Sequence, residues 1–387
     1  MGGRRLLSVA WRIALAAAIA TAAMMLVIGT LSTPQTWLYD FKGDLYVALR
    51  GILHGQDPYR PGLVAHELAL KAQIGRAVAI PTKPPSILLA FLPFGLLPAL
   101  PSGVLFVAMC AAAVFAALRL LGVRDWRCFA LAFASWPVIA GLGLGNASPL
   151  LLLGAAAMWR WRERLWSPAL ALAGMVLLKI FPWVLGAWFV VRRQWRALAL
   201  SVALALLTTT LAWAAIGFAG LTHYPKMILQ FGQAFQGTGP SLTSFLFWMG
   251  LSVGAAQLIA LACGGALVLA AWRLAQRPAD QGRAFGLIVA AALIAAPYIW
   301  DHYTVLLFVP IALCSPTLSW VWFVPVLPDF VGVHSAHDTL FLAFWVAIQG
   351  LVVIRILWPT AGRSIRALAP SPLGGLSGKS GAGYLVP

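Results

Sequence analysis

Apolar runs of about 20 residues recur along nearly the whole chain, and short polar stretches separate them. Each run is long enough to cross about 30 Å of hydrocarbon as a helix. A transmembrane barrel would show short alternating segments instead. The pattern predicts an all-α polytopic integral membrane protein with about 10–12 transmembrane helices and a long first outer loop.

The first apolar run, residues 13–31, is too long for a signal-peptide core, which favours an uncleaved signal anchor. Basic residues before it place the N-terminus in the cytoplasm, so it delivers the following polar stretch to the outer face. We expect one transmembrane domain over residues 1–358, with outer loops at 34–85 and 219–243. The Gly/Ser/Pro-rich segment 359–387 is expected to be a disordered cytoplasmic tail.

Later runs make further predictions. The sequence "PPSILLAFLPFGLLP" is short and bracketed by prolines, which favours a half-helix or an interfacial piece. Residues 128–144 read as one outgoing run, and residues 243–272 read as one long returning helix. The run "SPALALAGMVLLKIFPWVLGAWFVV" has basic residues at both ends but is too short for two full crossings. We therefore expect Lys179 and Pro182 to break it into a re-entrant or broken pair.

Composition and charge argue against a soluble protein and against a nucleic-acid-binding protein. Only 10% of the residues are charged and the mean hydropathy is +0.89, whereas soluble domains carry about 25% charged residues. The net charge of +17 lies mostly in short clusters between apolar runs, where Lys and Arg set membrane orientation, so it does not indicate nucleic-acid binding. The four cysteines lie in or beside apolar runs without CxxC spacing, as small buried side chains do.

Acidic residues gather directly after the first run. Three of the ten in the chain, Asp40, Asp44 and Asp57, lie in "DFKGDLYVALRGILHGQDPY". Asp40 and Asp44 are four apart and share one face if the segment is helical, which suits a general base or a metal ligand. The alternative is a solvated loop with an Asp at a helix N-terminus. Asp57 precedes a proline and is typical of a turn, with Tyr59 packing behind it.

Two other charged positions are candidates for chemistry. Lys179 lies part-way through an apolar run, where an ammonium is costly and marks a functional site, unless it reaches an interface. Asp301 and His302, in "APYIWDHYTVLLF", lie where one apolar run ends and another begins. They can position a substrate or transfer a proton, or they can simply face lipid headgroups. Interfacial packing explains Trp300 and Tyr303.

The predicted topology brings these polar residues to one side of the membrane. The residues expected at the outer face are Asp40, Asp44, Asn146, Ser241, Asp301 and His302. The sequence contains no GxGxxG, P-loop, GxSxG or HExxH motif. If a charged donor is used, it is therefore lipid-linked and enters from the bilayer. No ligand cluster indicates a metal, and no cofactor is expected.

The order of the motifs resembles glycosyltransferase family 87, polytopic GT-C enzymes that take a sugar from a polyprenyl phosphate. The similarity runs from Asp40 to His302 through five elements. These are "DFKGDLYVALRGILHGQDPY", "KPPSILLAFLPFGLLP", "GLGLGNASPLLLLG", "AGMVLLKIFPWVLGAWFVVRRQWRA" and "APYIWDHY". The resemblance implies a GT-C-like fold and a mannosyltransferase-like activity.

The resemblance also implies roles for single residues. The family's acidic residue after the first helix falls on Asp40, with Asp44 as the alternative, and His302 completes the catalytic group. Donor phosphate and lipid binding is carried over to Lys83, Asn146, Ser148 and Lys179. Substrate positioning is carried over to Tyr46, Tyr59, Ser241, Trp300 and Asp301. The chain departs from the family pattern at several of these positions: Lys83 stands where tyrosine is common, and Asn146 replaces a glutamine.

The implied reaction transfers a hexose, mannose by resemblance, to a lipid or glycan acceptor at the outer face, with inversion and an Asp base. The implied partners are the polyprenyl-phosphate sugar, that acceptor and membrane lipids. Two alternatives of other classes are a transporter or lipid flippase, whose Lys179 and Asp301 line a pathway, and an inactive assembly partner. A polyprenyl-phosphate-pentose transferase is the alternative within the enzyme class.

Overall fold

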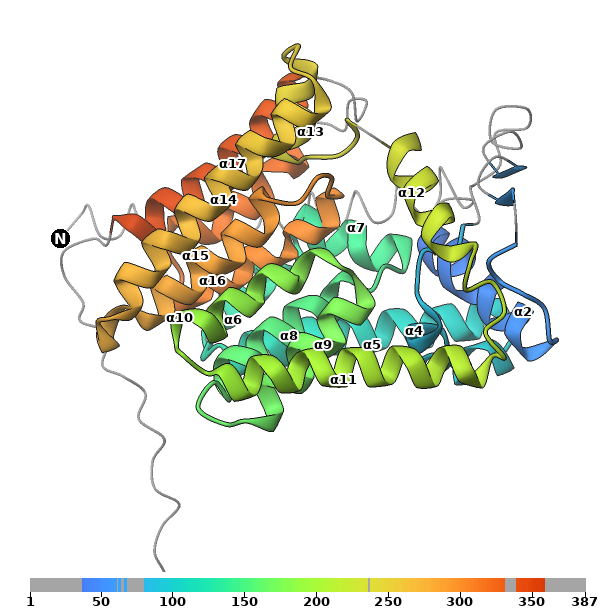
Figure 1. The fold of residues 1–387 in the computed structure, drawn as a ribbon. Coiled ribbons are helices and arrows are strands. Elements are labelled where there is room, and N and C mark those ends of the chain that lie inside the picture. Colours follow the sequence, from blue (N-terminus) through green and yellow to red (C-terminus); the bar gives the residue numbers. More distant parts are fainter. Residues whose placement is uncertain are drawn as a thin grey trace, which may run out of the picture.

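The computed structural model describes residues 37–60, 62–63, 66–67, 80–235, 237–330 and 339–358. Every regular element in these ranges is a helix (Figure 1). The predicted first span at 13–31 and the tail at 359–387 lie outside the described residues, as does part of the first loop. The prediction of an all-α polytopic membrane protein is confirmed.

Four described helices are long and apolar enough to cross a membrane by length and composition. They are α5 (Ala99–Leu120), α11 (Trp195–Ala215), α14 (Val253–Ala275) and α17 (Thr339–Leu357). The run predicted at 128–144 is a bent pair, α6 (Trp126–Phe133) and α7 (Trp136–Leu144), with 56° between its helices. Counting the pair as one span gives up to five crossings among the described residues. The remaining predicted crossings correspond to shorter helices or lie outside these ranges.

Shorter helices complete the bundle. They are α8 (Ser148–Arg160), α9 (Trp166–Leu178), η3 (Phe181–Gly186), α10 (Ala187–Val191), η4 (Pro278–Asp280), α15 (Gln281–Ile294), η5 (Asp301–Leu307), α16 (Phe308–Cys314) and η6 (Trp320–Phe330). Helix α15 is the core element, because every residue from Ala284 to Leu293 is buried. A helix that is apolar and buried all round needs neighbours on every side, and α15 packs against α14, α16, α17, η3 and η5.

The polar segments form short helices as well. They are η1 (Phe41–Tyr46), α2 (Val47–Leu53), α4 (Pro85–Ala90), η2 (Leu92–Leu96), α12 (Tyr224–Ala234) and α13 (Leu242–Trp248). In Figure 1, α2 and α12 lie at one end of the view, and α14 and α17 lie at the other. The proline-bracketed segment forms α4 and η2, in agreement with the predicted half-helix.

The prediction of one helix over 243–272 was wrong. The structure ends α13 at Trp248 and starts α14 at Val253. Gly250 between them has a φ of 98°, a left-handed conformation that no helix can contain. Ser252 then accepts a hydrogen bond from the Ala255 N–H at 3.3 Å and caps the new helix.

The chain breaks at Lys179 as the sequence predicts. Helix α9 ends at Leu178, Lys179 is extended with φ −152° and ψ 140°, and η3 starts at Phe181. Pro182 causes the break because it has no N–H to donate to the carbonyl of Leu178, four residues earlier. The side chain of Lys179 therefore projects from the short extended segment between two helices.

A close approach of backbones joins the first segment to the turn between α7 and α8. Gly145 ends α7 with φ 66°, and the Leu38 N–H donates to the carbonyl of Gly143 at 2.8 Å. A Cβ at position 145 would lie 2.7 Å from the Cβ of Phe41. Position 145 thus requires glycine for two reasons, the left-handed conformation and the close contact with Phe41. This contact brings Asp40 beside Asn146.

We expect Gly145→Ala to destabilise the protein by at least the cost of a left-handed non-glycine residue, about 1–2 kcal/mol, because Phe41 must also move. Thermal unfolding in detergent measures the loss. Gly143→Ala is the matched control, since a Cβ there meets nothing within 4 Å. Equal melting temperatures for the two variants would contradict the role assigned to Gly145.

Candidate active site

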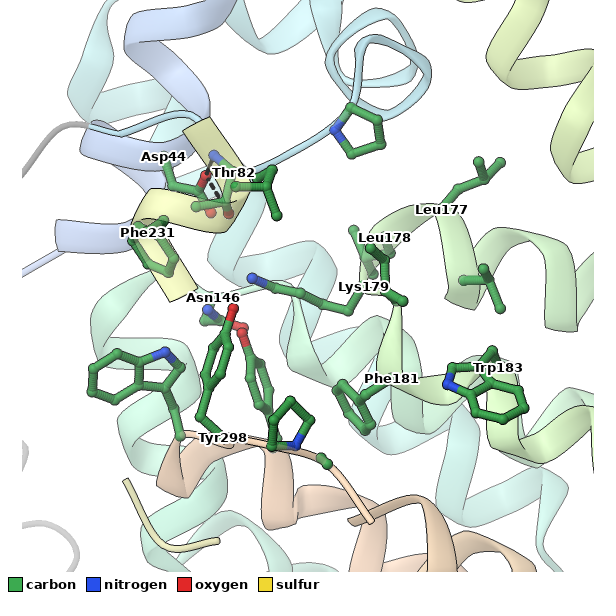
Figure 2. Close-up of a pocket in the computed structure, with 18 of the residues that line it drawn as sticks. Asp44, Thr82, Asn146, Leu177, Leu178, Lys179, Phe181, Trp183, Phe231 and Tyr298 are labelled. Carbon is green, nitrogen blue, oxygen red and sulfur yellow. Dashed lines mark hydrogen bonds between the residues drawn. The ribbon is translucent and has the colours of Figure 1, made fainter. Parts of the chain in front are cut away.

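A cavity of about 1090 Å³ lies where η1, the segment 80–84, the α7–α8 turn and the break after α9 meet (Figure 2). Helix α12 and residues 297–303 complete its wall. Seven of the predicted site residues line it: Asp40, Asp44, Asn146, Lys179, Trp300, Asp301 and His302. Residues up to 262 positions apart in the sequence thus come together in one place. Asp40 and Asp44 both face this cavity, as expected for two residues four positions apart on one helical face.

Five predicted residues lie outside the lining. Ser148 and Lys83 are buried directly behind it. Tyr46 points elsewhere and donates its hydroxyl to the carbonyl of Leu97 at 2.9 Å. Ser241 is buried at the start of α13, where it donates to the carbonyl of Pro297, a cavity residue, at 3.2 Å. Tyr59 is described below with the segment that it supports.

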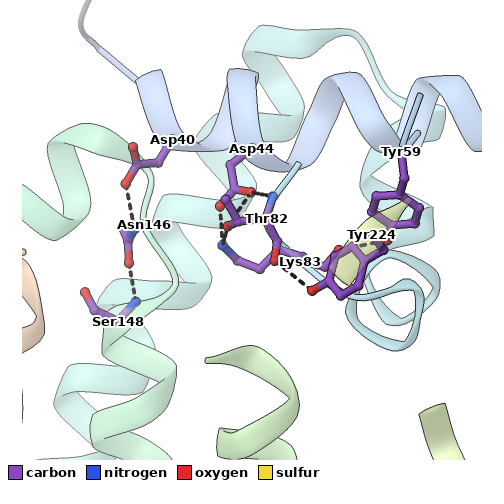
Figure 3. Close-up of polar contacts among 8 residues, drawn as sticks. All are labelled: Asp40, Asp44, Tyr59, Thr82, Lys83, Asn146, Ser148 and Tyr224. Atoms are coloured by element: carbon purple, nitrogen blue, oxygen red, sulfur yellow. Dashed lines mark hydrogen bonds and ion pairs between the residues drawn. The ribbon is translucent and has the colours of Figure 1, made fainter. Parts of the chain in front are cut away.

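Asp44 is held by three contacts (Figure 3). Its carboxylate forms an ion pair with the buried Lys83 ammonium and accepts from the N–H and the hydroxyl of Thr82, at 2.6 and 2.9 Å. Burial acts to raise the pKa of Asp44, but Lys83 and these hydrogen bonds outweigh it and hold the pKa below its usual value. The charge of Lys83 is thus balanced by Asp44 within the protein.

Two tyrosines fix the same segment through its backbone. Tyr224 of α12 donates to the carbonyl of Thr82 at 3.0 Å, and Tyr59 donates to the carbonyl of Lys83 at 2.8 Å. The two rings contact each other at 4.8 Å between centroids. The Asp57 carboxylate accepts from the Tyr59 N–H at 2.8 Å, which confirms the predicted turn. Tyr59 is buried and acts from behind the cavity.

Asp40 has a different environment from Asp44. Asn146 donates from its Nδ2 to Oδ2 of Asp40 at 2.6 Å (Figure 3). No ion pair of Asp40 is found in the part of the chain that the structure describes. Asp40 is therefore a cavity carboxylate with hydrogen-bonding capacity left for a ligand.

Lys179 reaches into the cavity from the break after α9 (Figure 2). Its ammonium lies 5.5 Å from the centroid of the Tyr303 ring, within the range of a cation–π contact. Among the described residues no carboxylate lies close enough to form an ion pair with it. An unpaired ammonium in a partly apolar cavity suits an anionic ligand.

Asp301 and His302 are held by contacts from α7 and from each other. The Trp136 indole N–H donates to Oδ2 of Asp301, and Nδ1 of His302 lies 3.5 Å from Oδ1. The His302 ring is 2% exposed and packs edge-on against Tyr303 at 4.5 Å. Within the described ranges neither ring nitrogen has a hydrogen-bond partner, although both are buried. A buried polar atom without a partner is uncommon and marks the imidazole as a candidate for a functional role.

Sequence reasoning missed part of the wall. The sequence predicts an outer loop over 219–243, but this segment contains helix α12. The side chains from α12 and its C-terminal end that line the cavity are Tyr224, Ile228, Phe231 and Phe235. Their spacing follows the helical period, and this signal could have found the helix. Tyr298 also lines the cavity, two residues before Trp300 in the same motif. The described residues contain no group of three or more His, Cys, Asp or Glu that could hold a metal.

The model of glycosyltransferase family 87 matches residues 82–297, more than half of the chain. The chain belongs to glycosyltransferase family 87. Most of the cavity wall falls inside the match. The Trp300–His302 group lies just after it, whereas Asp40 and Asp44 lie well before it.

Two curated relatives extend the similarity within family 87. The chain is 26% identical over 273 residues to a protein of Mycolicibacterium smegmatis, covering 64% of this chain and 60% of the relative. It is 25% identical over 268 residues to a protein of Mycobacterium tuberculosis, covering 64% and 57%. Both relatives are named polyprenol-phosphate-mannose-dependent alpha-(1-2)-phosphatidylinositol pentamannoside mannosyltransferase. The chain thus spans about three fifths of their length. No solved structure gives a significant match.

We expect Asp44→Asn and Lys83→Met each to destabilise the protein by about 3–5 kcal/mol, because each leaves one buried charge without its partner. The double variant should recover most of this loss. Melting temperatures in detergent test the cycle, and additive losses in the double variant would contradict a direct pair.

The same pair predicts a dependence of stability on pH. Because the folded state lowers the pKa of Asp44, the pair stabilises the protein above the unfolded carboxyl pKa of about 4. This contribution is lost as the pH falls below that value and Asp44 becomes protonated. The melting temperature of wild type should therefore fall more steeply towards acid pH than that of the double variant. A difference that is constant from neutral to acid pH would exclude this account.

Proposed function

We propose that this protein is a polyprenyl-phosphate-sugar-dependent glycosyltransferase that transfers a hexose, mannose first, to a lipid or glycan acceptor. The observation that carries the proposal is that one cavity contains both Asp40, a carboxylate with spare hydrogen-bonding capacity, and Lys179, an ammonium with no ion pair among the described residues. Family membership supports the same conclusion. The two relatives are named for a polyprenol-phosphate-mannose donor and a phosphatidylinositol mannoside acceptor.

An amphiphilic donor fits the wall around Lys179. The ammonium offers a charge to a phosphate, and exposed apolar side chains continue the wall beside it: Ile180, Trp183 and Leu206. Helices α11 and α14 expose most of their apolar surface and belong in contact with lipid. A polyprenyl chain can therefore stay in an apolar environment while its phosphate lies beside Lys179.

We assign the general base to Asp40 rather than Asp44. Asp44 is paired with Lys83 and accepts two hydrogen bonds from Thr82, whereas Asp40 accepts one from an amide. In the proposed reaction Asp40 takes the proton of an acceptor hydroxyl, and the hydroxyl oxygen forms a bond to the anomeric carbon. The bond from this carbon to the phosphate oxygen breaks, and the phosphate leaves with the electron pair. Attack opposite the leaving group inverts the centre, so a β-linked donor gives an α product.

Two groups can stabilise the leaving phosphate. Lys179 supplies a fixed positive charge, and His302 can donate a hydrogen bond from a ring nitrogen that has no partner among the described residues. Such groups act most strongly in a cavity that excludes water. Asp301, which accepts from Trp136, holds the backbone N–H of His302 at 3.0 Å and so orients the pair.

We further propose that the cavity opens at the outer face of the membrane. Helix α8 starts at the cavity beside Asn146 and ends at Arg160, and α9 returns from Trp166 to the cavity beside Lys179. Each helix has 13 residues and a length of about 20 Å. The loop between them contains Arg162 and Arg164 at the far end. Clustered arginines favour the cytoplasm, which supports an outer position for the cavity.

The test uses membranes from cells that express the chain, supplied with polyprenyl-phosphate mannose carrying radiolabelled mannose and with native lipid and glycan acceptors. We expect Asp40→Asn to lower kcat by about 10²–10⁴-fold, the usual contribution of a general base. Lys179→Met should lower kcat by about 10²-fold or more, and Lys179→Arg should retain more activity. His302→Ala and Asp44→Asn are compared at matched expression.

The outcomes separate the alternatives. Loss of transfer in Asp44→Asn with full activity in Asp40→Asn would reverse the assignment of the base. A parallel reaction supplies a polyprenyl-phosphate pentose, and transfer from this donor alone would assign the protein as a polyprenyl-phosphate-pentose transferase. Absence of transfer from either donor by wild type, together with movement of lipid across the bilayer, would replace the transferase with a flippase.

A further inference from the structure

The contacts of Asn146 differ from those expected of a residue that binds the donor phosphate. It is the sole asparagine of the 387 residues, it is 5% exposed, and its side chain already uses both of its polar ends. Oδ1 accepts from the backbone N–H of Ser148 at 2.8 Å, and Nδ2 donates to Asp40 at 2.6 Å. We propose that Asn146 is a positioning residue that orients the carboxylate of Asp40, in place of the donor contact that the family resemblance implies.

The orientation of the amide follows from its two neighbours. The Ser148 N–H can only donate, so it requires the carbonyl oxygen of Asn146, and the amino group must then face Asp40. The flipped amide would set its oxygen against the carboxylate and its amino group against the Ser148 N–H, which makes two repulsive contacts in place of two hydrogen bonds. The start of α8 therefore dictates which group Asp40 meets.

The backbone of Asn146 is fixed as firmly as its side chain. Its N–H donates to the carbonyl of Gly141 at 2.7 Å, and Gly145 before it adopts the left-handed conformation that ends α7. Asp40 is tied to the same turn by the hydrogen bond from the Leu38 N–H to Gly143. Both partners of the Asp40–Asn146 hydrogen bond are thus held by one turn, and their distance does not depend on a flexible loop.

The consequence for Asp40 is geometric. A hydrogen bond from Asn146 engages Oδ2 and restricts rotation of the carboxylate, while no hydrogen bond to Oδ1 is found among the described residues. Oδ1 is then the oxygen that receives the proton of the acceptor hydroxyl. This inference rests on the proposed function, because it assigns Asn146 to the base of that reaction.

The experiment compares Asn146→Asp with Asn146→Ala in the purified full-length chain. Aspartate keeps an oxygen for the Ser148 N–H but offers Asp40 a like charge, whereas alanine removes both contacts. We expect both variants to lower kcat by about 10-fold or more, with the KM for polyprenyl-phosphate mannose within about twofold of wild type. A rise in donor KM of about 10-fold with little change in kcat would overturn the proposal and restore the phosphate role.

A structural control separates positioning from general loss of stability. Ser135→Ala removes another buried hydrogen bond, from the Ser135 hydroxyl to the carbonyl of Ala132 at 2.6 Å, at the opposite end of α7. It should lower the melting temperature without lowering kcat. If Ser135→Ala and Asn146→Ala both lose activity in proportion to the decrease in their melting temperatures, Asn146 has only a structural role.

A second readout needs no enzymatic activity. In carbodiimide labelling a carboxyl oxygen of the protein attacks the central carbon of the reagent, and peptide mass spectrometry follows modification of Asp40. Loss of the Asn146 donor should speed this modification by about tenfold, the factor expected for a hydrogen bond to a charged group. An unchanged rate in Asn146→Ala would refute the contact. If wild type transfers no sugar but Asp40 is modified faster in the variant, the proposed function fails while the Asp40–Asn146 contact stands.

Discussion

The ion pair between Asp44 and Lys83 fixes the geometry on which the cavity depends. A buried pair is tolerated only when its geometry is good and its other hydrogen bonds are made, and here Thr82 supplies two of them. Because the pair joins η1 to the segment 80–84, it sets the position of the helical turn that presents Asp40. Tyr224 and Tyr59 then attach α12 and the turn at Asp57 to the same segment.

Much of the fold and of the site could be predicted from the sequence, because both depend on strong local signals. Long apolar runs can satisfy their backbone only as helices in a membrane, and a proline near Lys179 can only interrupt the run that contains it. The positive-inside rule then sorts the ends of the runs. This reasoning collected Asp40, Asn146, Lys179 and His302 into one group, and the structure places all four around one cavity.

What the sequence could not supply was which of these charges are paired. Asp44 and Lys83 lie 39 positions apart, and neither spacing nor composition distinguishes Lys83 from Lys179 as the free ammonium. The split between α13 and α14 was missed because the apolar signal continues across it and only the conformation of Gly250 ends the helix. Helix α12 was missed because its polar face resembles a loop, although its apolar face follows the helical period.

Pairing divides the charged residues of the cavity into two kinds. Charges that are already matched, as in Asp44 with Lys83, cost less to bury than lone charges and hold segments together, and they leave less hydrogen-bonding capacity for a ligand. An unmatched charge such as Lys179 is costly in a partly apolar wall and is relieved when an anion binds. A phosphate beside Lys179 would restore the balance, and its departure after transfer would restore the attraction for the next donor. On the proposed function, Lys179, which has no ion pair in the described part of the chain, is therefore the charge that draws the donor into the cavity.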